Sequence, residues 1–86
     1  MSDEIARRRQ QRTGFVTRLY WTVDGSVNEF VSAFEIGSEI GLGDADVARV
    51  LGYLEEKGFI KVDDHKLGIV RITAAGVDFV EAAESE

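Results

Sequence analysis

Four arginines and two glutamines stand together near the start of the chain, in the run "RRRQQR" at residues 7–12. Guanidinium and amide groups donate hydrogen bonds to phosphate oxygens, so the run is suited to a nucleic-acid backbone. Local pairing is the alternative, because Asp3 and Glu4 stand four residues before the first two arginines of the run. Arg9 and Arg12 have no such acid, and we expect these two to contact a DNA backbone.

The stretch "GLGDADVARVLGYLEEK" at residues 41–57 has the opposite charge. The helix expected over residues 44–57 carries four acids and two bases, for a net charge of −2. Phosphates repel a carboxylate, and the cytosine amino group is the one major-groove base edge that favours it. The alternative is local, because Asp44 and Asp46 fall in the first helical turn, where capping and the helix dipole favour negative charge.

His65 and Lys66 stand in the segment "DDHK" at residues 63–66, where a turn between two strands is expected. Such side chains could contact a phosphate or the minor groove, or they could simply be solvated in an exposed turn. A metal site is not expected here. Neighbouring residues on a strand point to opposite faces, and the chain has a single histidine.

The sequence offers little for catalysis or for a bound cofactor. It has no cysteine, which excludes disulfides, thiolate nucleophiles and zinc–thiolate sites. The stretch "GLGDAD" at residues 41–46 lacks the third glycine of a nucleotide-binding loop, and it joins two helices rather than a strand and a helix. No nucleophile has an evident base, so we expect neither an enzyme nor a cofactor.

Charge is unevenly distributed along the chain, whose net charge is −6. Residues 1–20 carry five arginines against two acids, for a net +3, whereas the rest carries five basic and fourteen acidic residues, for a net −9. A basic excess, usual in a nucleic-acid-binding domain, is therefore confined to the N-terminal end. No apolar run approaches about 20 residues, and the polar start lacks the core of a signal peptide, so we expect a cytoplasmic protein without membrane contact.

The elements that must position these side chains follow from hydrophobic periodicity and turn residues, which predict four helices and one hairpin. The expected helices cover about residues 3–23, 33–40, 44–57 and 74–84, and the hairpin joins residues 59–64 to 67–73. Ser32 and Thr73 are suited to cap the second and last helices, and Val31 to a short extended piece before the second. We interpret residues 1–86 as one domain, in which residues 1–14 form a basic N-terminal extension of the first helix.

The stretch "EIGSEIGLGDADVARVLGYLEEKGFIKV" resembles the helix-turn-helix of prokaryotic winged-helix proteins, with Ile36, Gly41, Leu42 and Val47 at the characteristic positions. "YLEEKGFI" is similar to that family's exit from the recognition helix into the wing, and "ITAAGVDFVE" to the start of the helix after the wing. The resemblance covers residues 15–84. It implies an α+β, mostly α fold: a winged helix-turn-helix with three helices, a two-stranded wing and a C-terminal helix.

In DNA-binding members of this family the outer face of the third helix lies in the major groove. The resemblance therefore implies that Ala45, Asp46, Arg49 and Tyr53 face DNA, and that Arg49 reads a base. Gly52 departs from this pattern, since a DNA reader would gain from a long basic side chain there.

A dimer is expected because so short a chain buries only about 60 to 65% of its unfolded surface. Trp21 points about half a turn away from the apolar face of the first helix, and exposed tryptophans usually have a partner. In similar winged-helix proteins the first and last helices pair across a two-fold axis, which implies an interface of Trp21, Val77 and Phe79. The alternative is that Trp21 covers the end of the core.

These observations favour a winged-helix protein that binds duplex DNA as a homodimer and regulates transcription. The rival hypothesis is a protein-interaction module, whose acidic third helix and Gly52 dock on another protein rather than on DNA.

Overall fold

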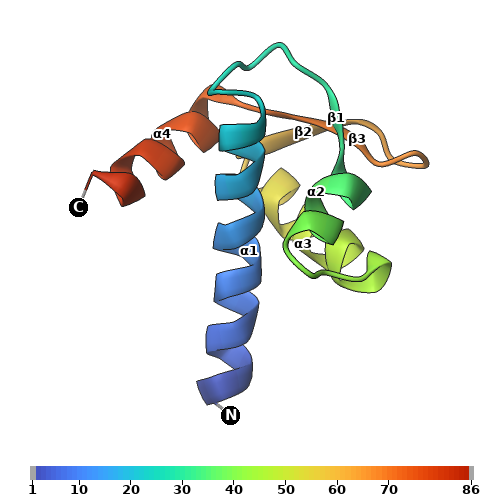
Figure 1. The fold of residues 1–86 in the computed structure, drawn as a ribbon, viewed down its shortest axis with the longest axis vertical. Helices are drawn as coiled ribbons and strands as arrows, with labels where there is room; N and C mark the ends of the chain where they lie inside the picture. Colours follow the sequence, from blue (N-terminus) through green and yellow to red (C-terminus); the bar gives the residue numbers. More distant parts are fainter. Residues whose placement is uncertain (1, 86) are drawn as a thin grey trace.

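The computed structural model describes residues 2–85, which form an α+β fold that is mostly helical, with four helices and a three-stranded antiparallel sheet (Figure 1). The helices are α1 (Ser2–Thr22), α2 (Ala33–Glu39), α3 (Asp44–Glu56) and α4 (Ala74–Glu84), and the strands are β1 (Val31–Ser32), β2 (Ile60–Asp64) and β3 (Ile69–Ile72). Their order along the chain is the predicted one. The two-residue strand β1 pairs with β3, so the hairpin becomes part of a larger sheet of order β1-β3-β2.

Helix α1 has two halves of different character. Its C-terminal half buries Phe15, Val16 and Leu19, whereas residues 3–10 are all exposed. Figure 1 shows that this N-terminal half projects beyond the other elements, with α4 on one side of α1 and the pair α2 and α3 on the other. The arginine run therefore lies on the exposed part of α1. The buried C-terminal half of the helix, which packs in the core, fixes the direction in which this part projects.

The core lies where the four helices and the sheet meet. No polar or charged side chain among the described residues is buried, so this core is held by apolar packing. Its largest fully buried side chains are Phe15, Leu19, Ile36, Leu54, Ile60 and Ile72.

Local capping forms α2 and α4 at the predicted places. The Ser32 side chain accepts a hydrogen bond from the backbone N–H of Glu35 at 3.4 Å, and that of Thr73 accepts from Gly76 at 3.1 Å. Helix α3 differs, because its N-cap is Gly43 and has no side chain to cap it. The acids of its first turn are therefore favoured by the helix dipole rather than by a capping hydrogen bond.

Two glycines allow α2 and α3 to pack closely against each other. Gly41 ends the turn between them with a φ of +79°, which glycine adopts at no steric cost. Gly37 lies inside α2, where a Cβ atom would collide with the Val47 side chain of α3. The packing of α2 on α3 thus depends on two features. The turn at Gly41 could be predicted from the sequence, whereas the close contact of Gly37 with Val47 could not.

Gly41 and Gly52 should respond oppositely to alanine, although both have open space around them. Gly41→Ala should lower the free energy of unfolding by about 1 kcal/mol because alanine is strained at positive φ. Gly52→Ala should raise it by about 0.5 to 1 kcal/mol because Gly52 is an exposed residue within a helix. Urea denaturation of both variants measures this, and a shift of the same sign in both would contradict the assigned turn.

Within residues 2–85, no helix combines the length and the apolar character that crossing a lipid bilayer requires.

Candidate functional site

The middle of α1, at Gln11 and Arg12, lies beside the outer face of α3, and three polar contacts join the two helices or brace the contact between them. The Arg49 guanidinium donates a hydrogen bond to the Gln11 side-chain oxygen at 2.6 Å and another to Asp46 at 3.1 Å. The Arg12 guanidinium lies 4.1 Å from the centre of the Tyr53 ring, a cation–π distance. The arginine run and the third helix, which are about forty residues apart in the sequence, therefore form one surface.

This α1–α3 surface consists of Arg8, Arg9, Gln11, Arg12, Arg49, Tyr53 and Lys57. It contains two adjoining hollows, of about 420 and 170 Å³, that share Arg12 and Tyr53. Five of its seven residues are basic, and they come from two helices. The net negative charge of α3 taken alone is thus a poor guide to the charge that this face presents.

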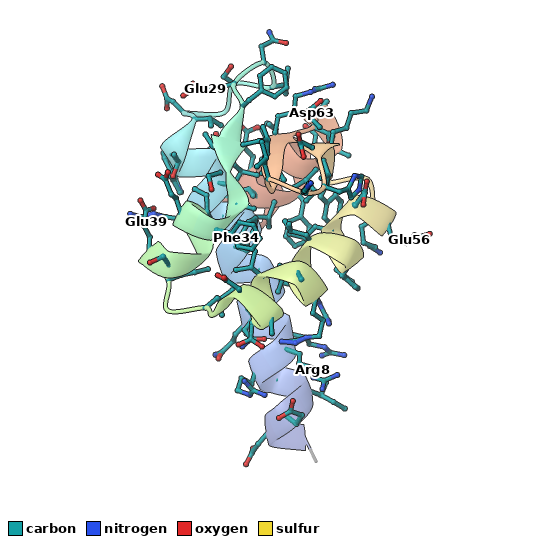
Figure 2. The ribbon with its side chains drawn as sticks, turned by 90° about the vertical axis from the view of Figure 1, so that its right-hand side faces the viewer. Arg8, Glu29, Phe34, Glu39, Glu56 and Asp63 are labelled. Atoms are coloured by element: carbon teal, nitrogen blue, oxygen red, sulfur yellow. The ribbon has the colours of Figure 1, made fainter. Side chains whose placement is uncertain are left out.

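Acidic side chains contact this surface at two of its basic residues, Arg8 and Arg49. Figure 2 shows Arg8 on the projecting part of α1, whereas the labelled Glu39, Glu56 and Asp63 lie on the body of the molecule. Two carboxylates do reach the basic residues, Glu4 on α1 and Asp46 on α3. Both ion pairs are exposed to solvent, so each is worth little and can exchange for another anion.

Glu4 pairs with the first two arginines of the run. Its carboxylate lies 2.8 Å from Arg7 and 2.9 Å from Arg8, and hydrogen bonds from Arg7 and then Arg8 hold the pKa of Glu4 below its usual value. The expected pairing of Asp3 with Arg7 is replaced by this shared contact. Among residues 3–85, no carboxylate forms an ion pair with Arg9, Arg12 or Lys57.

Arg49, the predicted base reader, is half-exposed and held in place from two sides. Its side chain is 37% accessible, with Asp46 one turn before it on α3 and Gln11 reaching it from α1. Ala45, one residue before Asp46, is exposed in the first turn of the helix. Asp46 therefore partly neutralises Arg49, which is a local function for one of the two aspartates of the first turn.

His65 and Lys66 lie apart from the arginines. The turn between β2 and β3 is fixed by Asp64, whose carboxylate accepts hydrogen bonds from the backbone N–H groups of Lys66 and Leu67, each at 2.9 Å. His65 reaches back to Glu55 near the end of α3, at 3.2 Å. The hairpin turn thus meets the last turn of α3, whereas the arginine run meets its middle.

The three residues predicted for a dimer interface do not share one face. Trp21 is 57% exposed and makes an edge-on contact with the Tyr20 ring, whereas Val77 is half-buried against the core. Phe79 lies in the larger hollow of the α1–α3 surface, where it stacks on Phe59 with the ring centres 4.7 Å apart.

Tyr20 connects α1 to α4 beside Trp21. Its hydroxyl donates a hydrogen bond to Glu81 at 2.7 Å, and this bond raises the pKa of Tyr20 above its usual value. A shallow, mainly apolar hollow lies at this contact, lined by Tyr20, Trp21 and Val80 and, at its edge, by Glu81, Glu84 and Ser85. Of the three predicted interface residues, Trp21 alone is therefore exposed, and it lies on α1 beside the C-terminal half of α4.

In comparisons with protein-family models, curated proteins and solved structures, nothing matches this chain. A proposal of function therefore rests on the geometry and charge of the α1–α3 surface.

Proposed function

We propose that this protein is a winged helix-turn-helix protein that binds duplex DNA and regulates transcription. The observation that carries the proposal is the contact between the arginine run of α1 and the outer face of α3. It brings five basic side chains to the face that would meet DNA, although the chain as a whole is acidic.

The arrangement of α2 and α3 supports this fold. The close contact of Gly37 with Val47 and the left-handed turn at Gly41 hold α3 at an angle to α2, as a helix-turn-helix requires. The β2–β3 hairpin follows α3 directly and would be the wing. Val47 is fully buried, so the opposite face of α3 is the part available to a groove.

The basic residues of α1 and of α3 would have different functions in DNA binding. Arg9 and Arg12 have no ion pair among the described residues, and contact with phosphates would release counterions from the DNA. Arg49 projects from the outer face of α3 and would make a two-pronged hydrogen bond to a guanine once both Asp46 and Gln11 release it. The arginines of α1 would thus supply affinity and Arg49 specificity.

Amide chemical-shift mapping during titration with duplex DNA tests this function. We expect shifts concentrated at residues 7–12 of α1, along α3 from Ala45 to Tyr53, and at His65 and Lys66. The face around Trp21 should show small changes by comparison. No shift at low salt, or shifts confined to the Trp21 face, would contradict DNA binding by this surface.

A protein-interaction module is the second candidate function, because Arg49 is bound to Asp46 and Gly52 has open space above it. A neutralised, flat stretch of helix suits a protein partner better than DNA. In that case DNA should produce no saturable shifts in the mapping experiment.

We also propose that two copies associate through the Trp21 side of α1 and α4. Trp21 and Phe30 are exposed to almost the same extent, 57% and 56%, but only Trp21 lies beside the apolar hollow at α4. Sedimentation at micromolar concentration should give twice the mass of the chain. Trp21→Ala should weaken the dimer by about tenfold, because buried tryptophans are frequent interface hot spots.

Phe30→Ala is the matched control for the dimer and should leave the sedimentation unchanged. A wild-type protein that sediments as a single chain, or equal effects of the two variants, would exclude this interface.

A further inference from the structure

The larger hollow of the α1–α3 surface has a composition that DNA-backbone contact does not require. It opens between α1, α3, the residue before β2 and α4, and it has a volume of about 420 Å³. Arg9, Arg12 and Lys57 line it together with three aromatic side chains, Tyr53, Phe59 and Phe79. We propose that this hollow binds a small planar aromatic anion, such as an aromatic carboxylate or phosphate ester.

The positive charge of the hollow favours an anionic ligand. Three cationic side chains line it, and no carboxylate of the described chain does. None of the three forms an ion pair within residues 3–85, so each can donate a charge-assisted hydrogen bond to an anionic ligand. Arg18 shows the contrast, because its guanidinium is bound to Glu39 at 2.9 Å.

The aromatic lining requires a planar ring on that anion. Phe59 and Phe79 stack with an angle of 26° between their rings, and both remain partly accessible. Tyr53 adds a third ring, over which the Arg12 guanidinium lies. An inorganic phosphate would use the cations and leave this apolar surface in water, whereas an aromatic anion covers both parts of the site.

The size of the hollow suits a ligand of one or two rings. Its volume falls within the range of about 300 to 1,000 Å³ that is usual for small-molecule sites. Such a ligand would hold α1, α3 and α4 together, because each of these helices contributes to the lining. It would also occupy Arg9 and Arg12, so if the proposed DNA binding holds, ligand and DNA would compete for these two side chains.

Calorimetric titration of the protein alone with 1-naphthoate and with 1-naphthyl phosphate tests the site. We expect at least one of them to bind at a single site with a dissociation constant below millimolar. The neutral 1-naphthamide and the non-aromatic cyclohexanecarboxylate should each bind at least about tenfold more weakly. The amide lacks the negative charge, and cyclohexanecarboxylate lacks the aromatic rings.

Variants show whether binding takes place in this hollow. Arg12→Gln and Lys57→Gln should each weaken binding of the tighter naphthyl anion by about tenfold. Arg18→Gln removes the same charge elsewhere on α1 and should leave binding unchanged. The proposal is overturned if neither anion binds, if the neutral amide binds equally well, or if Arg18→Gln weakens binding as much as Arg12→Gln. Because no DNA is present, these outcomes are independent of whether the protein binds DNA.

Discussion

A protein in which Arg9 and Arg12 are both replaced by glutamine is expected to bind duplex DNA about 10- to 100-fold more weakly than the wild type at about 0.1 M salt. Each phosphate contact on B-DNA contributes a slope of about −0.9 to the dependence of log affinity on log salt, so at this salt each lost contact costs just under tenfold. Both arginines lack an ion pair within the described chain, so neither substitution breaks a salt bridge of the folded protein. Fluorescence anisotropy with labelled duplex DNA measures the change.

Arg18→Gln is the matched control for the double variant, because Arg18 lies on the same helix and is bound to Glu39. It should change DNA affinity by less than about twofold, which separates a local contact from a general effect of net charge. Arg12 also lies over Tyr53, so thermal unfolding of the double variant must show an intact fold. If the control and the double variant weaken binding equally, the arginine run is not a specific DNA contact.

Arg49→Ala is expected to cost about 1 to 3 kcal/mol of binding free energy on a selected DNA site, and little on random DNA. Arg49 carries a guanidinium on the outer face of α3, where a two-pronged contact to guanine would discriminate between bases. The measurement compares Arg49→Ala and the wild type on a site enriched from random duplexes and on a shuffled sequence. The effect should appear on the selected site alone, in contrast to the equal weakening expected for Arg9 and Arg12.

Asp46 gives an independent test of Arg49, because it holds the Arg49 guanidinium at 3.1 Å. Asp46→Asn should strengthen DNA binding, since it weakens the competing hydrogen bond to Arg49 and removes a charge that phosphates repel. A different pattern would favour the protein-interaction function. Suppose that Arg49→Ala leaves binding to the selected site and to random DNA unchanged, and that Asp46→Arg creates DNA binding where there was none. In that case α3 does not read DNA.

The parts of the fold that depend on neighbouring residues could be predicted from the sequence. Ser32 and Thr73 cap helices because each side chain reaches a backbone N–H three residues ahead, as the spacing predicts. Gly41 ends its turn because the left-handed conformation favours glycine whatever the rest of the fold does. The order of helices and strands follows from such local signals together with apolar periodicity.

Contacts between distant residues could not be predicted in the same way. The pairing of Val31 with Val70 makes β1 a strand of the sheet, and nothing within two residues of Val31 specifies that partner. The packing of Gly37 against Val47 depends on the angle between two helices. Helical periodicity assigned Gly37 no role, because a glycine adds no side chain to an apolar face.

The candidate site shows the same division. Arginine composition predicted a basic N-terminal segment, but its contact with α3 through Gln11 and Arg49 joins residues 38 positions apart. The aromatic hollow had no sequence signal, because its lining comes from residues near positions 9, 53 and 79 and no linear motif connects them. Phe79 illustrates the consequence, since its ring stacks on Phe59, which lies twenty positions earlier between α3 and β2.

The central claim is that the arginines of α1 and the outer face of α3 form one DNA-binding surface. The salt dependence of wild-type binding to random duplex DNA, followed by fluorescence anisotropy, tests this most directly. With three or four of its basic residues in contact with phosphates, log affinity should fall linearly with log salt with a slope of about −2.7 to −3.6, and the Arg9 and Arg12 double variant should flatten that slope by about 1.8. Absence of binding at low salt, or a slope that the double variant leaves unchanged, would contradict the claim.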